Sequence, residues 1–122
     1  MKPVIRSSIA YVAGCLVNRK SFGTISDMAQ NRLLKMDGRF DGGNIDVQDL
    51  ENGSTLMGMT MAPDASFFHS GENATISIRF NGTLFTGKDG VSGRNFNGAV
   101  QGTSVKVYDY DEGKHFDFLL SD

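Results

Sequence analysis

The sequence predicts an all-β fold, either a small antiparallel barrel or a sandwich, with little or no helix. Short apolar runs alternate with polar residues at period two through most of the chain. Turn-forming residues separate these runs, and glycine is frequent (15 residues) where proline is scarce (2 residues). Short strands with regular turn signals are typical of antiparallel barrels and sandwiches. A length of 122 residues predicts a single domain, 1–122.

The first elements are predicted from apolar patterning. Residues 8–17 (SIAYVAGCLV) are apolar on both alternating faces, which predicts a central strand containing a buried cysteine. Residues 22–25 form a second candidate strand. Residues 26–36 fit two structures: a short helix capped by Ser26, or an irregular loop followed by a strand. We favour the loop and strand.

Residues 56–61 (LMGMTM) predict a further strand, in which three methionines fall on one face. A three-residue loop at residues 51–53 pairs Asp49 with Thr55, and in that register we expect the methionine face to belong to the core with Ile45 and Val47. The alternative is a pliable binding surface, because methionine side chains adapt to different partners.

The middle of the chain contains the longest predicted loop and the strongest hairpin signal. Residues 62–73 break the alternating pattern and are predicted to form the loop, with His69 as an ordinary solvated residue. Residues 74–80 (ATISIRF) alternate regularly and predict a strand. Asn81 and Gly82 follow it, and this dipeptide favours a two-residue hairpin turn.

An internal similarity relates two parts of the chain. Residues 37–54 align without a gap with residues 97–114, at an offset of 60 positions. This similarity predicts duplication of one structural unit and two halves related by a pseudo-twofold axis. The turn residues shared by the two copies are Asp49 and Asp109, with Gly53 and Gly113.

The second copy continues into a predicted hairpin with a three-residue loop at residues 111–113. In that register Tyr108 lies opposite Phe116, and both point away from the core. The hairpin then presents an aromatic face for a protein partner or for a second copy of the chain. The alternative is that these rings cover a second small core. The residues of this predicted face are Lys106, Tyr108, Tyr110, Phe116 and Phe118.

The same register places His115 between two carboxylates, Asp109 and Asp117. A histidine with flanking carboxylates can act as a general base or a metal ligand. The sequence places no serine or cysteine nucleophile beside it, so these residues are only weak catalytic candidates. The acidic stretch 109–113 lacks the spacing of a calcium loop, and we expect no metal and no cofactor.

Composition bears on partners and on compartment. A formal net charge of −2 gives no electrostatic reason to expect nucleic acid, and no apolar run approaches the roughly 20 residues that span a bilayer. A single cysteine excludes an internal disulfide and favours the cytoplasm. The stretch Val12–Cys15 resembles the lipobox of bacterial lipoproteins, which makes a lipoprotein the minor alternative.

These observations predict a non-enzymatic module for protein binding or self-assembly. The first alternative is a carbohydrate-binding domain, because turn-rich β folds with exposed tyrosines bind sugars by stacking and polar contacts. The second is an enzyme of unknown class that uses the His115 cluster.

Overall fold

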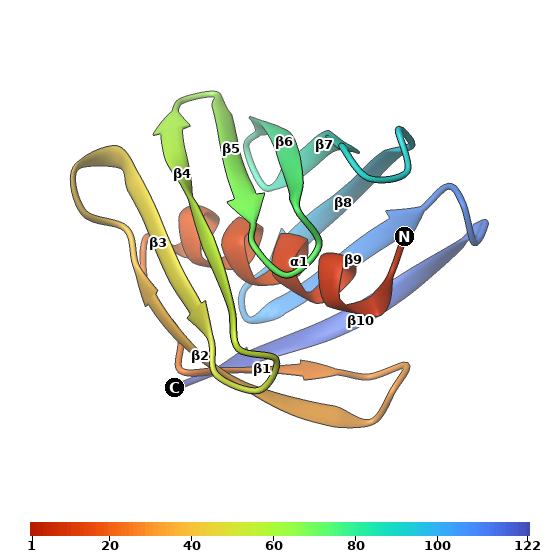
Figure 1. The fold of residues 1–122 in the computed structure, drawn as a ribbon, viewed down its shortest axis with the longest axis horizontal. Coiled ribbons are helices and arrows are strands. Elements are labelled where there is room, and N and C mark those ends of the chain that lie inside the picture. The colour runs from red at the N-terminus through yellow and green to blue at the C-terminus, as the bar shows by residue number, and fades with distance from the viewer.

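The computed structural model describes residues 1–122 as a closed barrel of ten antiparallel strands around one helix (Figure 1). Each strand pairs with its neighbours in the chain, and β1 also pairs with β10, which closes the barrel. The all-β prediction is confirmed, with a barrel as the architecture. The elements are α1 (Pro3–Asn18), β1 (Thr24–Asp27), β2 (Arg32–Arg39), a 3-10 turn (Asp41–Gly43), β3 (Asn44–Asp49), β4 (Ser54–Met61), β5 (Asp64–His69), β6 (Ala74–Asn81), β7 (Leu84–Asp89), β8 (Asn95–Gln101), β9 (Ser104–Asp109) and β10 (Lys114–Ser121).

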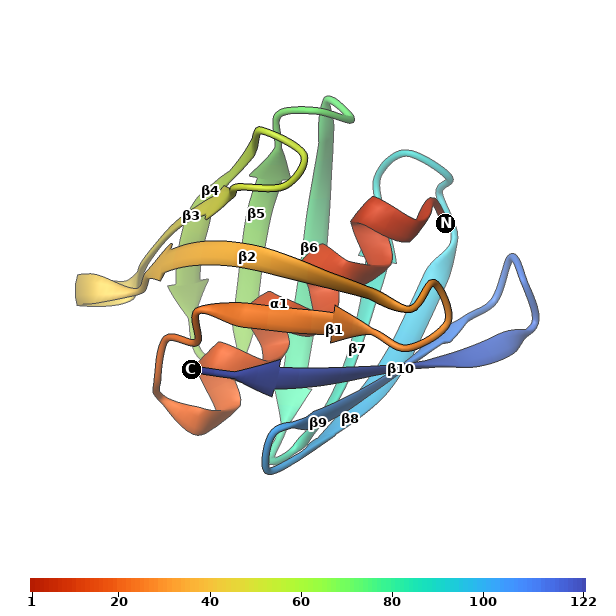
Figure 2. The ribbon, with the colours of Figure 1, turned by 90° about the horizontal axis from the view of Figure 1, so that it is seen from below.

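Helix α1 lies inside the barrel, and Figure 2 shows it between β1, β2 and β10 on one side and β5 to β7 on the other. Every residue from Ile5 to Cys15 is buried, whichever way its side chain points. A helix that is apolar on all sides must be surrounded on all sides. The strand predicted over residues 8–17 is therefore wrong, because a run apolar on both faces also fits a fully buried helix. Pro3 at the first turn is favourable for a helix start.

Two other predicted segments differ from the structure. Residues 62–73 are not one long loop, because β5 runs through them as part of the barrel wall. Ser26 caps no helix, since it lies within β1. The favoured loop and strand over residues 26–36 correspond to the end of β1, a turn at residues 28–31 and the start of β2.

Glycines occupy inward positions where neighbouring strands approach closely. Gly58 pairs with Ile45 and Phe67, both of which point into the core. A Cβ added at Gly58 would overlap the carbonyl oxygen of Ser66 in β5. Barrel walls bend sharply at such positions because no side chain holds the strands apart.

The turns at one end of the barrel share one design. Strands β1, β3, β7 and β9 each end in a buried aspartate whose Oδ1 accepts backbone N–H bonds from the turn that follows. Strand β5 ends in His69, which is 1% exposed, so its predicted solvation is wrong. The aspartates are Asp27, Asp49, Asp89 and Asp109.

The segments 37–54 and 97–114 each contain the end of one strand, a whole six-residue strand and the turn that follows it. The same arrangement recurs elsewhere, because β3, β5, β7 and β9 begin at residues 44, 64, 84 and 104. The offset of 60 positions thus spans three hairpins of the ten-strand meander. The proposed pseudo-twofold relation between two halves stays a prediction.

Candidate functional site

The predicted aromatic face of the C-terminal hairpin is wrong for two of its five residues, Phe116 and Phe118. The turn between β9 and β10 has four residues, so His115 pairs with Tyr108, and Phe116 pairs with Val107. Phe116 and Phe118 consequently point into the core and are 5% and 2% exposed. One extra residue in a turn moves every following side chain to the other face of the sheet.

Tyr108, Tyr110 and Lys106 do lie on the outer face, as predicted. The rings of Tyr108 and Tyr110 pack edge to face with their centroids 4.8 Å apart, and the centroid of the His115 ring lies 4.8 Å from that of Tyr108. The outer face of this hairpin is therefore a small cluster of three rings, without the two phenylalanines. Lys106 lies 3.7 Å from Asp117, measured from Nζ to Oδ1.

The predicted cluster of His115, Asp109 and Asp117 does not form. Asp109 is fully buried beneath its turn, whereas His115 and Asp117 are exposed on the outer face. The three side chains share no hydrogen bond or ion pair. No group of three metal-ligating side chains occurs anywhere in the chain.

Asp109 belongs instead to a buried ionic network at the start of α1. Its Oδ2 lies 3.2 Å from Arg6 Nη1 and 3.2 Å from the α-amino nitrogen of Met1. The Arg6 guanidinium also covers the Phe116 ring at 3.7 Å. Burial alone would raise the pKa of Asp109, but the N–H bond from Glu112 and the two cations outweigh it, and the pKa lies below its usual value. Asp109 and Arg6 are 0% and 5% exposed, so these two charged side chains are closed off from solvent.

The same register error explains the methionines of β4. In the structure Asp49 pairs with Ser54 and Val47 with Leu56, so the inward face of β4 is formed by Leu56, Gly58 and Thr60. The three methionines point outward and are 56%, 56% and 72% exposed, and the prediction that they belong to the core is wrong. Phe68 pairs with Met57 from β5 and is 42% exposed. We call Met57, Met59, Met61 and Phe68 the methionine stripe.

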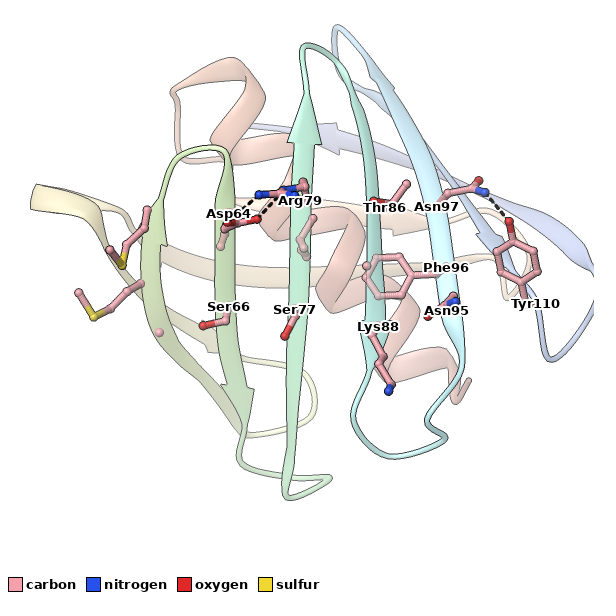
Figure 3. Close-up of a pocket in the computed structure, with 16 residues that line it drawn as sticks. Asp64, Ser66, Ser77, Arg79, Thr86, Lys88, Asn95, Phe96, Asn97 and Tyr110 are labelled. Atoms are coloured by element: carbon pink, nitrogen blue, oxygen red, sulfur yellow. Dashed lines mark hydrogen bonds and ion pairs between the residues drawn. The ribbon is translucent and has the colours of Figure 1, made fainter.

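A shallow groove of about 790 Å³ borders the methionine stripe on the outer face of β4 to β8 (Figure 3). Met59 and Met61 line one side of it, and Tyr110 lies at the opposite end. Two rows of polar side chains cross the strands between them. The first row contains Asp64, Arg79, Thr86 and Asn97, and the second contains Ser66, Ser77, Lys88 and Asn95.

Hydrogen bonds fix both ends of the first row. Arg79 Nε donates to Asp64 Oδ1 at 3.0 Å, so this cation is already paired. Asn97 Nδ2 donates to the Tyr110 hydroxyl at 2.8 Å, which holds the tyrosine at the end of the groove. Sequence reasoning missed this groove. Its signal was the repeated Ser, Thr, Asn or Lys at outward positions of four consecutive strands, which only the correct register brings into line.

His69 provides a prediction about pH. Its Nδ1 accepts the Glu72 N–H at 3.1 Å, so the ring proton is on Nε2, which is buried without a partner. Burial lowers the pKa of His69 below 6.5, although the carboxylates of Glu72 and Asp49 raise it in part. The unfolded chain therefore binds a proton more readily than the folded one. This contribution to stability is complete above about pH 6.5 and is lost as the pH falls through the lower pKa of the folded state.

We expect the melting temperature of the wild type to be lower at pH 5 than at pH 7.5. We expect this decrease to be smaller in a His69→Asp variant. Aspartate occupies the equivalent position of the other four turns, and its carboxylate accepts N–H bonds at both pH values. The exposed His115, replaced by Asn, is the matched control. Equal pH dependence in wild type and His69→Asp would refute this role.

Comparison with known proteins gives no relative: no family model, curated protein or solved structure matches this chain. Helix α1 is too short to cross a membrane, and no other α-helix is present.

Proposed function

We propose that the protein is a non-enzymatic binding domain that binds a protein partner through the methionine stripe. The observation that carries this proposal is the position of four large apolar side chains, side by side on β4 and β5, with 42% to 72% of each exposed. Contiguous apolar patches on a folded domain mark interaction sites more often than isolated apolar residues do.

The chemistry of the stripe suits an adaptable contact. Methionine is unbranched and polarisable, and it packs against partners of different shapes. Covering one such side chain contributes up to roughly 1.5–3 kcal/mol in transfer free energy, so a few suffice to anchor a segment. Because the barrel is closed, it offers no free strand edge for a partner to extend. Binding must therefore use side chains on the outer wall.

A display library of random 12-residue peptides, selected on immobilised wild-type protein, tests this proposal. We expect the selected peptides to bind a Met57→Ser, Met59→Ser variant at least about tenfold more weakly, because the variant loses the adaptable apolar contact. A Val91→Ser variant is the matched control, since Val91 is 49% exposed in a turn outside the stripe. Equal binding to all three proteins, or no enrichment, would contradict a role of the stripe in binding.

Carbohydrate binding is the second candidate, favoured by the Tyr110 ring at the end of a groove with a floor rich in hydroxyl and amide groups. A sugar ring stacks on an aromatic face while its hydroxyls bond to such polar groups. A glycan array, probed with wild type and with Tyr110→Ala, tests it. Binding that is lost with the tyrosine supports it, and absence of binding to every glycan eliminates it.

A further inference from the structure

We propose that the bound partner segment is extended, crosses the strands from β4 to β7, and places an acidic side chain on Lys88. This inference rests on the proposed function, because it describes the segment whose apolar residues cover the methionine stripe. The partner segment then contains apolar residues and one carboxylate at a fixed separation from them.

Lys88 is the one cation of the groove without a carboxylate partner. Arg79, the other cation there, is paired with Asp64. Elsewhere on the surface, Lys106 and Arg94 also have carboxylate partners, Asp117 and Asp111. The groove therefore carries one uncompensated positive charge, on a chain whose formal net charge is −2. Electrostatic complementarity of this kind selects and orients a partner more than it adds affinity.

The neighbours of Lys88 suit a carboxylate. Lys88 pairs across the sheet with Ser77 on β6 and with Asn95 on β8. The Ser77 hydroxyl and the Asn95 side-chain amide can both donate hydrogen bonds to a carboxylate that is bound by the Lys88 ammonium group. Bonds that involve a charged group are the stronger ones. One small polar side chain on each side also leaves room for the incoming group.

Register fixes the separation between the apolar and the acidic contacts. Met59, Ser66, Ser77 and Lys88 form one row of successive cross-strand pairs, so Met59 and Lys88 are three strand spacings apart. At about 4.8 Å per spacing, this is about 14 Å. An extended chain advances about 3.3 Å per residue and covers that distance in about four residues. The two serines between them keep the floor of the groove low.

The peptide selection tests this inference separately from the proposed function. We expect the selected peptides to carry Asp or Glu about four residues from an apolar residue. We expect their affinity to fall at least about tenfold with Lys88→Glu. Lys35→Glu is the matched control. Lys35 lies on β2, is exposed and forms no ion pair, and β2 is five strands away from β7 in the barrel wall. Affinity should also fall as salt is added.

Each other outcome overturns the inference in a recognisable way. Peptides that need the methionines but lack an acidic residue, or that bind Lys88→Glu equally well, overturn the role of Lys88 and leave the proposed function intact. Peptides indifferent to both the methionine and the lysine changes overturn both proposals. Binding of polygalacturonate that requires Lys88 but not the methionines assigns the groove to an acidic polysaccharide instead.

Discussion

An Asp109→Asn variant is expected to lose about 3 kcal/mol of unfolding free energy, because breaking a buried ion pair leaves the Arg6 charge without a carboxylate partner. The carboxylate contacts Arg6 and the Met1 α-amino group, and it also accepts backbone N–H bonds from Asp111 and Glu112. Asparagine keeps the size and one acceptor oxygen but removes the charge. Arg6 is 5% exposed and has no other carboxylate partner, so water cannot replace what it loses.

Urea denaturation at pH 7 measures this loss, with Asp117→Asn as the control, since the Asp117 side chain is 62% exposed. The pKa of Asp109 is lowered in the folded state, so its contribution to stability is present above the ordinary value of 3.8 and is lost as the pH falls through the folded value. The difference in unfolding free energy between wild type and Asp109→Asn should therefore become smaller in strong acid. A loss no larger than that of the control would show that the network contributes little.

A Gly58→Val variant is expected to destabilise the barrel by at least about 3 kcal/mol, or to leave it unfolded. The added Cβ overlaps main-chain atoms of Ser66 and Phe67 in β5, and main-chain atoms cannot rotate away as a side chain can. Overpacking costs about 1–3 kcal/mol even where side chains can adjust. Moving β5 outward would also disturb its pairing with β6 on the other side.

Thermal unfolding of the purified variants measures this effect, or the soluble yield does so where Gly58→Val does not fold. Gly23→Ala is the control, because a Cβ there meets only ordinary contact, 3.4 Å from the carbonyl carbon of Asp122. Gly58→Ala separates the Cβ overlap from the bulk of valine and should already lose most of the stability. A Gly58→Ala protein as stable as the control would refute the close approach of β4 and β5.

Local alternation predicted the strands well, and loop length decided what could not be predicted. A three-residue loop and a four-residue loop both fit the Gly-ended turns at Gly53 and Gly113. The choice between them reverses the outer and inner faces of the returning strand. The buried aspartate before each turn belongs to the four-residue form, because its Oδ1 reaches N–H groups two and three residues on.

That single misassignment produced both errors at the candidate site. It placed Phe116 outside and Met57 inside, whereas the structure has the reverse. The inward face of β4 was hard to recognise because Gly58 and Thr60 are not strongly apolar, although the close approach of β5 requires glycine at residue 58. Helix α1 was missed for a different reason: without one polar face, neither helical nor strand periodicity stands out.

The helix enclosed by the barrel also constrains the order in which this protein can be made. The apolar surface of α1 is synthesised before the strands of the barrel, yet it packs mainly against β9 and β10, almost 100 residues later. The wall closes only when β10 pairs with β1, so closure depends on contacts between segments far apart in sequence. A nascent chain on the ribosome must keep residues 5–15 from aggregating until residues 114–121 emerge, because the barrel cannot close before then.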